Sequence, residues 1–332
     1  MSLLDPICII GAGAFGTALA IAATRAGRSV LLYGRDAAQI AEMAYTRTNS
    51  AYLPDVLLPC TLLITSNLND VSAANLIVLA TPAQTTRTVV DTLSPIIKPN
   101  VPLILTAKGI ERETGLYPSQ IVAQIMPQNP LALLSGPSFA IDVANGLPTA
   151  VALACADILL AQTLAKALNS SHFRIYHTSD TSGVEIGGAA KNVLAIAAGI
   201  VEGQGLGESA KATLIARGFA EMGRFAQAYG AKMETLMGLS GLGDLVLTCS
   251  SDRSRNFSFG KSIGAGDNVS GAGKVKPYSL VEGAYTAQIL VKLAEKHGVE
   301  MPICRSVAEI VAGRITVQDA IFQLTTRPQK SE

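Results

Sequence analysis

The chain has 332 residues, enough for two hydrophobic cores, because a single core usually stops growing at roughly 250 to 300 residues. Apolar residues make up 49% of the sequence and charged residues only 15%, which excludes a disordered chain. Lys plus Arg number 26 and Asp plus Glu 25, so no global field would attract nucleic acid or an anionic membrane, and any anion must be bound locally.

The cysteines predict a reducing, cytoplasmic environment and no metal site. They lie dozens of residues apart, without C-x-x-C pairs or nearby histidines at metal-ligand spacing, at Cys8, Cys60, Cys155, Cys249 and Cys304. The apolar N-terminus is interrupted by Asp5 and Pro6, and no basic residue precedes it, so we expect no export signal. The sequence contains no run of about 18 uncharged apolar residues, which a membrane span would need, so we expect no membrane span.

Short β-rich runs alternate with helical patterns from residue 6 to about residue 178. In chain order the runs are PICII, SVLLY, LLITS, NLIVLA, VPLILTA, LALLSG, TAVALA and FRIYHT. This alternation predicts a mainly parallel sheet with crossover helices.

Beyond about residue 180 the strand signals stop and helical periodicity takes over. Residues 209–230 show it clearly and end on Gly230, which is placed like a C-cap. We therefore predict an α/β domain over residues 1–180 and an all-α domain over residues 181–332. Residues 262–274 are rich in Gly, Ser and Asp and lack an apolar face, so we expect a mobile loop there.

The first strand is followed by the glycine pattern G-x-G-x-x-G, formed by Gly11, Gly13 and Gly16. Gly11 permits a tight turn, Gly13 lets a pyrophosphate approach the backbone, and Gly16 lets helix and strand pack closely. Within the first βαβ unit of an alternating sheet, this pattern predicts a dinucleotide site. A flavin or nucleotide-sugar site on the same scaffold is the alternative.

The end of the second strand bears on the choice between NAD and NADP. An acidic residue there usually holds the ribose 2′-hydroxyl of NAD, but Tyr33 is followed by Gly34 and Arg35. An arginine can pair with a 2′-phosphate, so NADP is accommodated, although the neighbouring Asp36 leaves both cofactors open. Arg35 could also be a surface charge that opens a helix.

One lysine lies among small and aliphatic residues in the segment EIGGAAKNVLAI. On a helix, Gly187, Gly188 and Ala195 lie within one turn of Lys191 and leave its ammonium accessible to a small reactant. Lys191 could instead extend to solvent from the edge of a buried helix.

Further polar residues follow predicted strands or open predicted helices. They are Lys108 in TAKGIE, Gly136 and Ser138 in SGPSFA, and Asp244, Ser254, Arg255 and Asn256 in GLGDLVLTCSSDRSRN. Ligands collect at the carboxyl ends of parallel strands, so we expect Lys108 and Ser138 to face the same crevice as the glycine turn. Each residue taken singly could equally be a loop charge or a helix cap.

Together, GAGAFGTALA, TAKGIE, SGPSFA, EIGGAAKNVLAI, GLGDLVLTC, SRNFSFG and VEG resemble, in order and spacing, bacterial NAD(P)-dependent glycerol-3-phosphate dehydrogenases. The resemblance extends to about residue 305, and GGAAKN followed by GLGDL and SRN is its most specific part. It implies an N-terminal Rossmann domain for NAD(P)H, an all-helical domain with a catalytic lysine, and a homodimer.

The resemblance also implies roles for single residues. Lys191 would transfer the proton. The substrate would be bound by Lys108, Gly136, Ser138, Lys191, Asp244, Ser254, Arg255 and Asn256. The cofactor would be bound by Gly11, Gly13, Ala14, Phe15, Gly16, Arg35, Lys108, Ala140, Arg255, Leu280 and Glu282. Relatives often carry Ser at position 14, so a hydroxyl contact is missing here, although backbone N–H groups can serve.

Reduction of dihydroxyacetone phosphate puts charge on the C2 oxygen, and an ammonium at Lys191 would supply both charge stabilisation and a proton. The reverse reaction needs a neutral amine, so its pKa must fall from about 10.4 toward the working pH. Ser254, Arg255 and Asn256 at a helix N-terminus would hold the phosphate. A β-hydroxyacid-type dehydrogenase and a non-catalytic NAD(P)-responsive binding protein are the alternatives.

Overall fold

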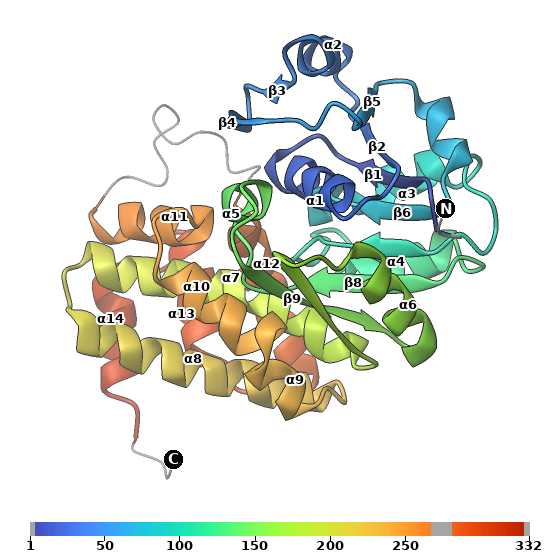
Figure 1. The fold of residues 1–332 in the computed structure, drawn as a ribbon. Coiled ribbons are helices and arrows are strands. Elements are labelled where there is room, and N and C mark those ends of the chain that lie inside the picture. The colour runs from blue at the N-terminus through green and yellow to red at the C-terminus, as the bar shows by residue number, and fades with distance from the viewer. Residues whose placement is uncertain (1–3, 267–280, 329–332) are drawn as a thin grey trace. The chain divides into compact units, whose positions relative to one another are not determined.

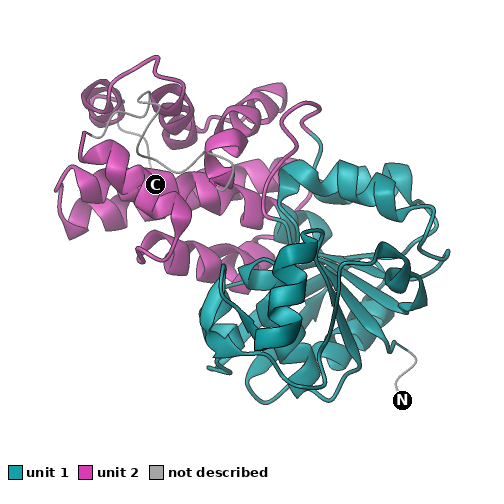
Figure 2. Ribbon diagram, turned by 90° about the horizontal axis from the view of Figure 1, so that it is seen from above, with its two compact units in different colours: residues 1–107, 116–185 teal, residues 108–115, 186–332 magenta. Residues whose placement is uncertain are grey.

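The computed structural model describes residues 4–266 and 281–328. The chain divides into two compact units (Figure 2): unit 1 comprises residues 1–107 and 116–185, and unit 2 comprises residues 108–115 and 186–332. The short segment 108–115 therefore groups with the C-terminal half, although sheet residues precede and follow it in the chain.

Unit 1 is built on an eight-stranded sheet with the order β10-β9-β8-β7-β6-β1-β2-β5 (Figure 1). The strands are β1 (Ile7–Ile10), β2 (Val30–Tyr33), β5 (Leu63–Thr65), β6 (Leu76–Leu79), β7 (Leu103–Leu105), β8 (Leu131–Ser135), β9 (Thr149–Cys155) and β10 (Phe173–Thr178). All pairings are parallel except that of β8 with β9, so β9 and β10 run opposite to the other six strands. Each of the eight predicted runs forms one of these strands, which confirms the mainly parallel sheet.

Helices cover both faces of this sheet because its central strands are apolar on both faces. Ile7 and Ile9 of β1 belong to one buried cluster with α1 (Ala14–Arg25) and α6 (Ile158–Leu168). Cys8 and Ile10 belong to the opposite cluster with α3 (Thr86–Leu93) and α4 (Pro118–Ile125). Such unbroken burial is typical of parallel strands between two helical layers.

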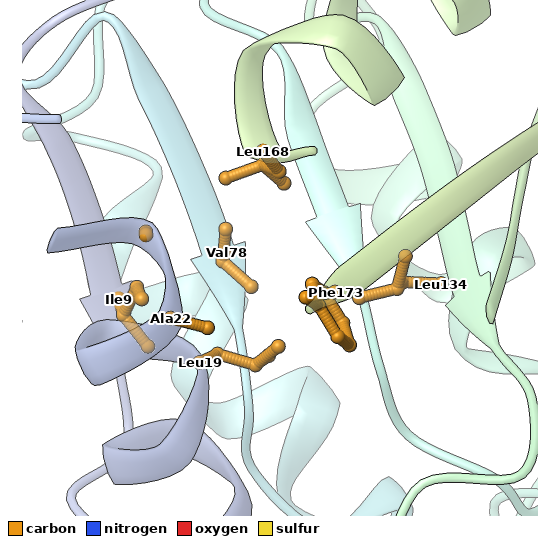
Figure 3. Close-up of a pocket in the computed structure, with 8 residues that line it drawn as sticks. Ile9, Leu19, Ala22, Val78, Leu134, Leu168 and Phe173 are labelled. Atoms are coloured by element: carbon orange, nitrogen blue, oxygen red, sulfur yellow. The ribbon is translucent and has the colours of Figure 1, made fainter. Parts of the chain in front are cut away.

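Packing in the first cluster leaves one small void (Figure 3). It measures about 10 Å³ and is lined by Ile9, Leu19, Ala22, Ala23, Val78, Leu134, Leu168 and Phe173. A water molecule needs at least this volume and also polar partners, which these side chains do not offer. The void is therefore a packing defect in the core and not a ligand site.

A small two-stranded sheet in unit 1 was not predicted. It pairs β3 (Thr48–Asn49) with β4 (Leu53–Leu57) in antiparallel fashion after α2 (Ala37–Thr46). The segment LPDVL contains a proline and exposes three of its five residues, so it gives no sustained apolar alternation. The remaining helix of unit 1 is α5 (Ala140–Ala144), with short 3₁₀ turns at Leu68–Ala73 and Ala83–Thr85.

From residue 186 onward, helices are the regular structure of the described part of unit 2, as predicted, whereas segment 108–115 contains no helix. The helices of unit 2 are α7 (Thr181–Gly203), which begins in unit 1, α8 (Glu208–Ala228), α9 (Met233–Met237), α10 (Asp244–Cys249), α11 (Arg255–Gly264), α12 (Glu282–Lys296), α13 (Pro302–Val311) and α14 (Val317–Thr325). A π-helical turn, Leu239–Gly243, leads directly into α10.

The predicted loop over residues 262–274 was wrong at its start, because α11 continues through Gly264. Small residues here allow close contact with α7, so their lack of an apolar stripe does not indicate a loop. Residues 267–274 lie outside the described part of the chain.

Helix α7 is the one described helix long and apolar enough to cross a membrane by composition. However, 94% of the apolar 18-residue stretch of this helix is buried inside the protein. This burial is typical of the central helix of a globular core.

Candidate active site

The glycine turn after β1 has two glycines that the fold itself requires. Gly11 adopts φ +114°, and a Cβ there would lie 2.7 Å from the Ala80 carbonyl oxygen. A Cβ on Gly16 would lie 2.0 Å from the Gly11 carbonyl oxygen, which confirms the predicted close packing of helix and strand. A Cβ on Gly13 would meet no described atom within 4 Å. Packing therefore explains Gly11 and Gly16 but not Gly13.

The small β3–β4 sheet supplies a support for this turn that sequence reasoning missed. The fully buried Asn49 donates from Nδ2 to the Ala12 carbonyl oxygen at 3.0 Å and to Thr17 Oγ1 at 2.8 Å. Gln39 of α2 donates to the same carbonyl at 3.1 Å and to Asn49 Oδ1 at 3.3 Å. The backbone between Gly11 and Gly13 is thus fixed from the side. Only the spatial pairing of these segments shows this role.

The two charged residues after β2, Arg35 and Asp36, have different roles. The carboxylate of Asp36 accepts from the backbone N–H groups of Ala38 and Gln39 at 3.0 and 3.1 Å, so it caps α2. Arg35 is exposed and forms no hydrogen bond or ion pair with the described residues. The Asp36 carboxylate is therefore occupied in capping its own helix, whereas the Arg35 guanidinium is available to a ligand.

The segment after β8 carries three of the predicted residues in unit 1. A Cβ on Gly136 would lie 2.8 Å from Cα of Val151 in β9, so glycine is needed for this close approach. The Ser138 hydroxyl donates to the Gly136 carbonyl oxygen at 3.0 Å, and Ala140 begins α5. This turn places Ser138 and the start of α5 beyond the carboxyl end of β8.

Lys191 lies in unit 2 on α7 and is only 7% exposed. Its Nζ donates to Asp244 Oδ1 at 3.0 Å and to Thr248 Oγ1 at 2.6 Å. Burial lowers the pKa of Lys191 below its ordinary value, the Asp244 carboxylate opposes this shift, and the Lys108 charge adds to it. The alternative that Lys191 extends into solvent is therefore excluded.

Asp244 binds a second lysine through its other oxygen. Lys108 Nζ donates to Asp244 Oδ2 at 2.6 Å, a contact within unit 2 because segment 108–115 groups with the helices. Ile110 of this segment is fully buried. Burial alone would raise the pKa of Asp244, but the charges of Lys108 and Lys191 outweigh it and hold that pKa below its ordinary value. The carboxylate thus stays ionised between two lysines.

A chain of buried amides links Lys108 to two further helices. Asn192 of α7 donates to the Lys108 carbonyl oxygen at 2.8 Å and accepts from Asn256 Nδ2 at 2.9 Å. Asn256 Oδ1 accepts from the backbone N–H of Gly283 at 3.0 Å. These bonds connect α7, α11, α12 and the Lys108 segment. Asn256 was predicted to bind substrate, and two of its side-chain hydrogen bonds are to protein groups.

Helix α11 begins at Arg255, in the place predicted for an anion-binding helix start. Ser254 is its N-cap and accepts from the Phe257 N–H at 3.2 Å. The Arg255 side chain is exposed and forms no hydrogen bond or ion pair with the described residues. Glu282 begins α12, and Leu280 lies outside the described residues.

Thr248 is a second residue that sequence reasoning missed. It lies one helical turn after Asp244 on α10, and its hydroxyl contacts both Lys191 Nζ and the Asp244 backbone carbonyl. The spacing of four residues from an acidic site residue was the available signal, because such residues share a helix face. Structurally, the cluster consists of Lys108, Lys191, Asp244 and Thr248.

Comparisons with known proteins cover the whole chain. The profile of the NAD-dependent glycerol-3-phosphate dehydrogenase N-terminus matches residues 6–161, and that of the C-terminus matches residues 180–322. Glycerol-3-phosphate dehydrogenase (NAD(P)⁺) of Azorhizobium caulinodans is 52% identical over 332 residues, all of both chains. The protein of that name from Rhodopseudomonas palustris strain TIE-1 is 49% identical over the same span.

Solved structures agree with this assignment. The crystal structure of glycerol-3-phosphate dehydrogenase from Coxiella burnetii superposes with a TM-score of 0.90 at 36% identity, over 98% of this chain and 100% of that one. The matching profiles, the full-length relatives and this structure all name one enzyme family. The chain belongs to the NAD-dependent glycerol-3-phosphate dehydrogenase family.

Proposed function

We propose that this protein catalyses the reversible, NAD(P)H-dependent reduction of dihydroxyacetone phosphate to sn-glycerol 3-phosphate, with Lys191 as the proton-transfer residue. The observation that carries the proposal is the hydrogen bonding of Lys191. A lysine ammonium has three N–H donors, and two of them are directed to Asp244 and Thr248. The third remains for the oxygen of a substrate.

The lowered pKa of Lys191 suits both directions of the reaction. In reduction, NAD(P)H bound to the protein would supply the hydride to C2. The ammonium stabilises the charge that develops on the C2 oxygen and then donates a proton to it. In oxidation, the neutral amine accepts the hydroxyl proton. A buried lysine with an ordinary pKa would rarely be neutral near pH 7, so the shift supports this role.

Asp244 is best explained as the group that orients the two lysines. Each of its oxygens accepts from one ammonium, Oδ1 from Lys191 and Oδ2 from Lys108. The single carboxylate leaves one net positive charge in the cluster, which favours an anionic substrate. We propose that Lys108 contacts the substrate and the cofactor from this position.

For the phosphate, we propose Arg255 together with the N-terminus of α11. The N–H groups in the first turn of a helix have no intrahelical partners, and they attract anions. Arg255 adds a guanidinium that can bind two phosphate oxygens. Ser254 and Asn256 flank it, and Asn256 keeps one amide N–H outside its bonds to Asn192 and Gly283. From unit 1 we propose Gly136 and Ser138 as further substrate contacts.

The cofactor fits the glycine turn of unit 1. Packing does not require glycine at position 13, whereas backbone access for a pyrophosphate does. The N-cap of α1 has no side-chain hydrogen bond, so its first N–H groups, including those of Ala14 and Phe15, can face the pyrophosphate. Arg35 would pair with a 2′-phosphate of NADP. Ala140, Lys108, Arg255, Leu280 and Glu282 are the other proposed contacts.

We further propose that the enzyme works in the cytoplasm as a homodimer, without a membrane span, and supplies glycerol 3-phosphate for glycerophospholipid synthesis. The burial of α7 supports the absence of a span. Exposed apolar residues of unit 2, among them Phe322 and Leu206, could support self-association. Sedimentation or light scattering of the purified protein tests the oligomeric state.

A steady-state assay tests the proposed reaction. The purified protein is expected to oxidise NADH or NADPH when dihydroxyacetone phosphate is added, and to act in reverse on sn-glycerol 3-phosphate. Phosphate-free dihydroxyacetone and a β-hydroxyacid with NAD(P)⁺ serve as comparison substrates. Turnover of the β-hydroxyacid without turnover of the triose phosphate would contradict the proposal and favour the β-hydroxyacid dehydrogenases.

A further inference from the structure

Helices α7 and α11 of unit 2 touch through their backbones (Figure 1). A Cβ on Gly260 would lie 2.0 Å from the Ile196 carbonyl oxygen, and one on Gly264 would lie 2.4 Å from the Ile200 carbonyl oxygen. From the other side, a Cβ on Gly199 or Gly203 would lie 2.0 or 2.1 Å from the carbonyl oxygens of Phe257 and Lys261. We call these four glycines the α7–α11 seam.

The seam fixes a register between the two helices. The first rung is the hydrogen bond between Asn192 and Asn256. The next rungs pair Ile196 with Gly260 and Ile200 with Gly264, four residues further along each helix. The helices therefore run parallel in constant register. Lys191 directly precedes the first rung on α7, and Arg255 directly precedes it on α11.

We propose that the α7–α11 seam fixes the spacing between the backbone positions from which Lys191 and Arg255 extend, and so selects substrates by the distance between their carbonyl and their phosphate. This inference rests on the proposed function, in which Lys191 meets the C2 oxygen and Arg255 meets the phosphate. In dihydroxyacetone phosphate, one methylene group separates the carbonyl carbon from the phosphate ester oxygen. Gly199, Gly203, Gly260 and Gly264 are positioning residues in this reaction.

Backbone contact makes the spacing between α7 and α11 rigid. Flexible side chains between helices could adjust their rotamers, but two backbones in contact cannot approach further or slide past the facing glycines. Glycine is also a poor helix former, so four glycines in one seam disfavour both helices unless close packing offsets the loss. An added Cβ at 2.0 Å would need about 1 Å or more of displacement to reach ordinary contact. Errors of about 1 Å in a reacting geometry can reduce rates about 10²-fold.

The test compares two substrates that differ by one methylene group. Dihydroxyacetone phosphate is the first, and 4-hydroxy-3-oxobutyl phosphate, which has two methylene groups between carbonyl and ester oxygen, is the second. The wild type is expected to prefer the first by on the order of 10² in kcat/KM. In Gly260→Ala this preference should fall by about 10-fold or more, with a raised KM for dihydroxyacetone phosphate.

A binding measurement gives a readout that does not depend on turnover. Calorimetric dissociation constants for sn-glycerol 3-phosphate and 3,4-dihydroxybutyl phosphate should show the same loss of preference in Gly260→Ala. Val307→Ala is the control, because Val307 is a buried residue of α13 outside the seam. It should lower the melting temperature and leave the preference unchanged. A purely stabilising role of the seam would give Gly260→Ala this same behaviour and would overturn the proposal.

If Gly260→Ala does not fold, Gly203→Ala and the wild type alone can still test the proposal. Gly203 is the last residue of α7, where the chain can bend away, so Gly203→Ala should fold and show a smaller shift in the same direction. A wild type that uses both substrates equally well would overturn the proposal without any variant. If the wild type turns over neither, the proposed function fails instead.

Discussion

Asp244 determines the charge balance of the proposed site, because one buried carboxylate serves two lysines. The contacts of Asp244 with the two lysines could not be predicted from the sequence. Asp244 is 136 positions from Lys108 and 53 positions from Lys191 along the chain. The residues themselves could be predicted, because Lys108 follows a strand, Asp244 begins a helix, and Lys191 is a single charge among small and aliphatic residues. Thr248 was missed because a threonine inside an apolar helix usually has only a structural role.

Lys191→Ala should lower kcat for dihydroxyacetone phosphate by about 10² or more, because it removes proton transfer and charge stabilisation together. Affinity for NADPH, measured by fluorescence titration, should stay near that of the wild type. Lys211→Ala is a matched control, since Lys211 of α8 pairs with Glu202 in the last turn of α7 and with Glu208 at the start of α8. Near-normal turnover by Lys191→Ala would refute the mechanism.

Asp244→Asn should shift the pH dependence of the reaction. Reduction needs the ammonium form, so its rate falls as pH rises through the pKa of Lys191. The Asp244 carboxylate raises that pKa, and its removal should move the alkaline limb of the kcat profile to lower pH. Oxidation, which needs the neutral amine, should begin at lower pH. An alkaline limb that stays in place or moves upward would show that another group titrates.

Arg255→Ala should raise the KM for dihydroxyacetone phosphate by about 10-fold to 10²-fold, because a lost charge-assisted phosphate contact weakens ground-state binding. Part of the effect can come from the cofactor. Arg253→Ala is a nearby control, because Arg253 is exposed and precedes the cap of α11. An unchanged KM in Arg255→Ala would place the phosphate elsewhere.

At the level of helices and strands, sequence patterns predicted the elements whose apolar residues are buried in the cores. All eight main strands were found from their β-rich runs, and the central strands among them are buried by helices on both faces. The β3–β4 pair was missed because a two-residue strand and a proline-containing partner have no periodic signal. The end of α11 was misplaced because Ser262, Gly264 and Gly266 are typical of loops, whereas backbone packing on α7 favours small residues.

Glu221 shows how one helix supports another. It is 2% exposed on α8 and accepts from the backbone N–H groups of Ile303 and Cys304 at 2.8 and 3.2 Å, at the start of α13. The N-cap residue of α13, Met301, provides no side-chain hydrogen bond, so Glu221 replaces the missing cap. Burial raises the pKa of Glu221 from 4.5 to about 7, against the effect of these two bonds.

This raised pKa predicts a pH-dependent stability. The folded chain binds the Glu221 proton more tightly than the unfolded chain, so the resulting stabilisation is full below pH 4.5 and is lost as pH rises to about 7. Over this range, the free energy of unfolding of the wild type relative to Glu221→Gln should fall by up to about 3 kcal/mol. Urea titrations at several pH values measure it, and parallel pH curves would contradict it.

For the whole molecule, the glycine turn and the lysine cluster belong to different compact units. Substitutions at Lys191 or Thr248 should therefore leave the stabilisation of the protein by NADPH unchanged, since neither residue is proposed to bind the cofactor. Thermal melts with and without NADPH measure this. A loss of cofactor-induced stabilisation in Thr248→Val would show that Thr248 also supports the nucleotide site.

Segment 108–115 has a consequence for dividing this protein into pieces. A fragment that ends at residue 180 would retain Ile110 and Lys108, which pack and pair within the helical unit, and the complementary fragment would lack them. During synthesis, Lys108 must likewise await the much later emergence of Asp244 from the ribosome. Separately expressed halves should therefore regain the ion pair only when they are combined.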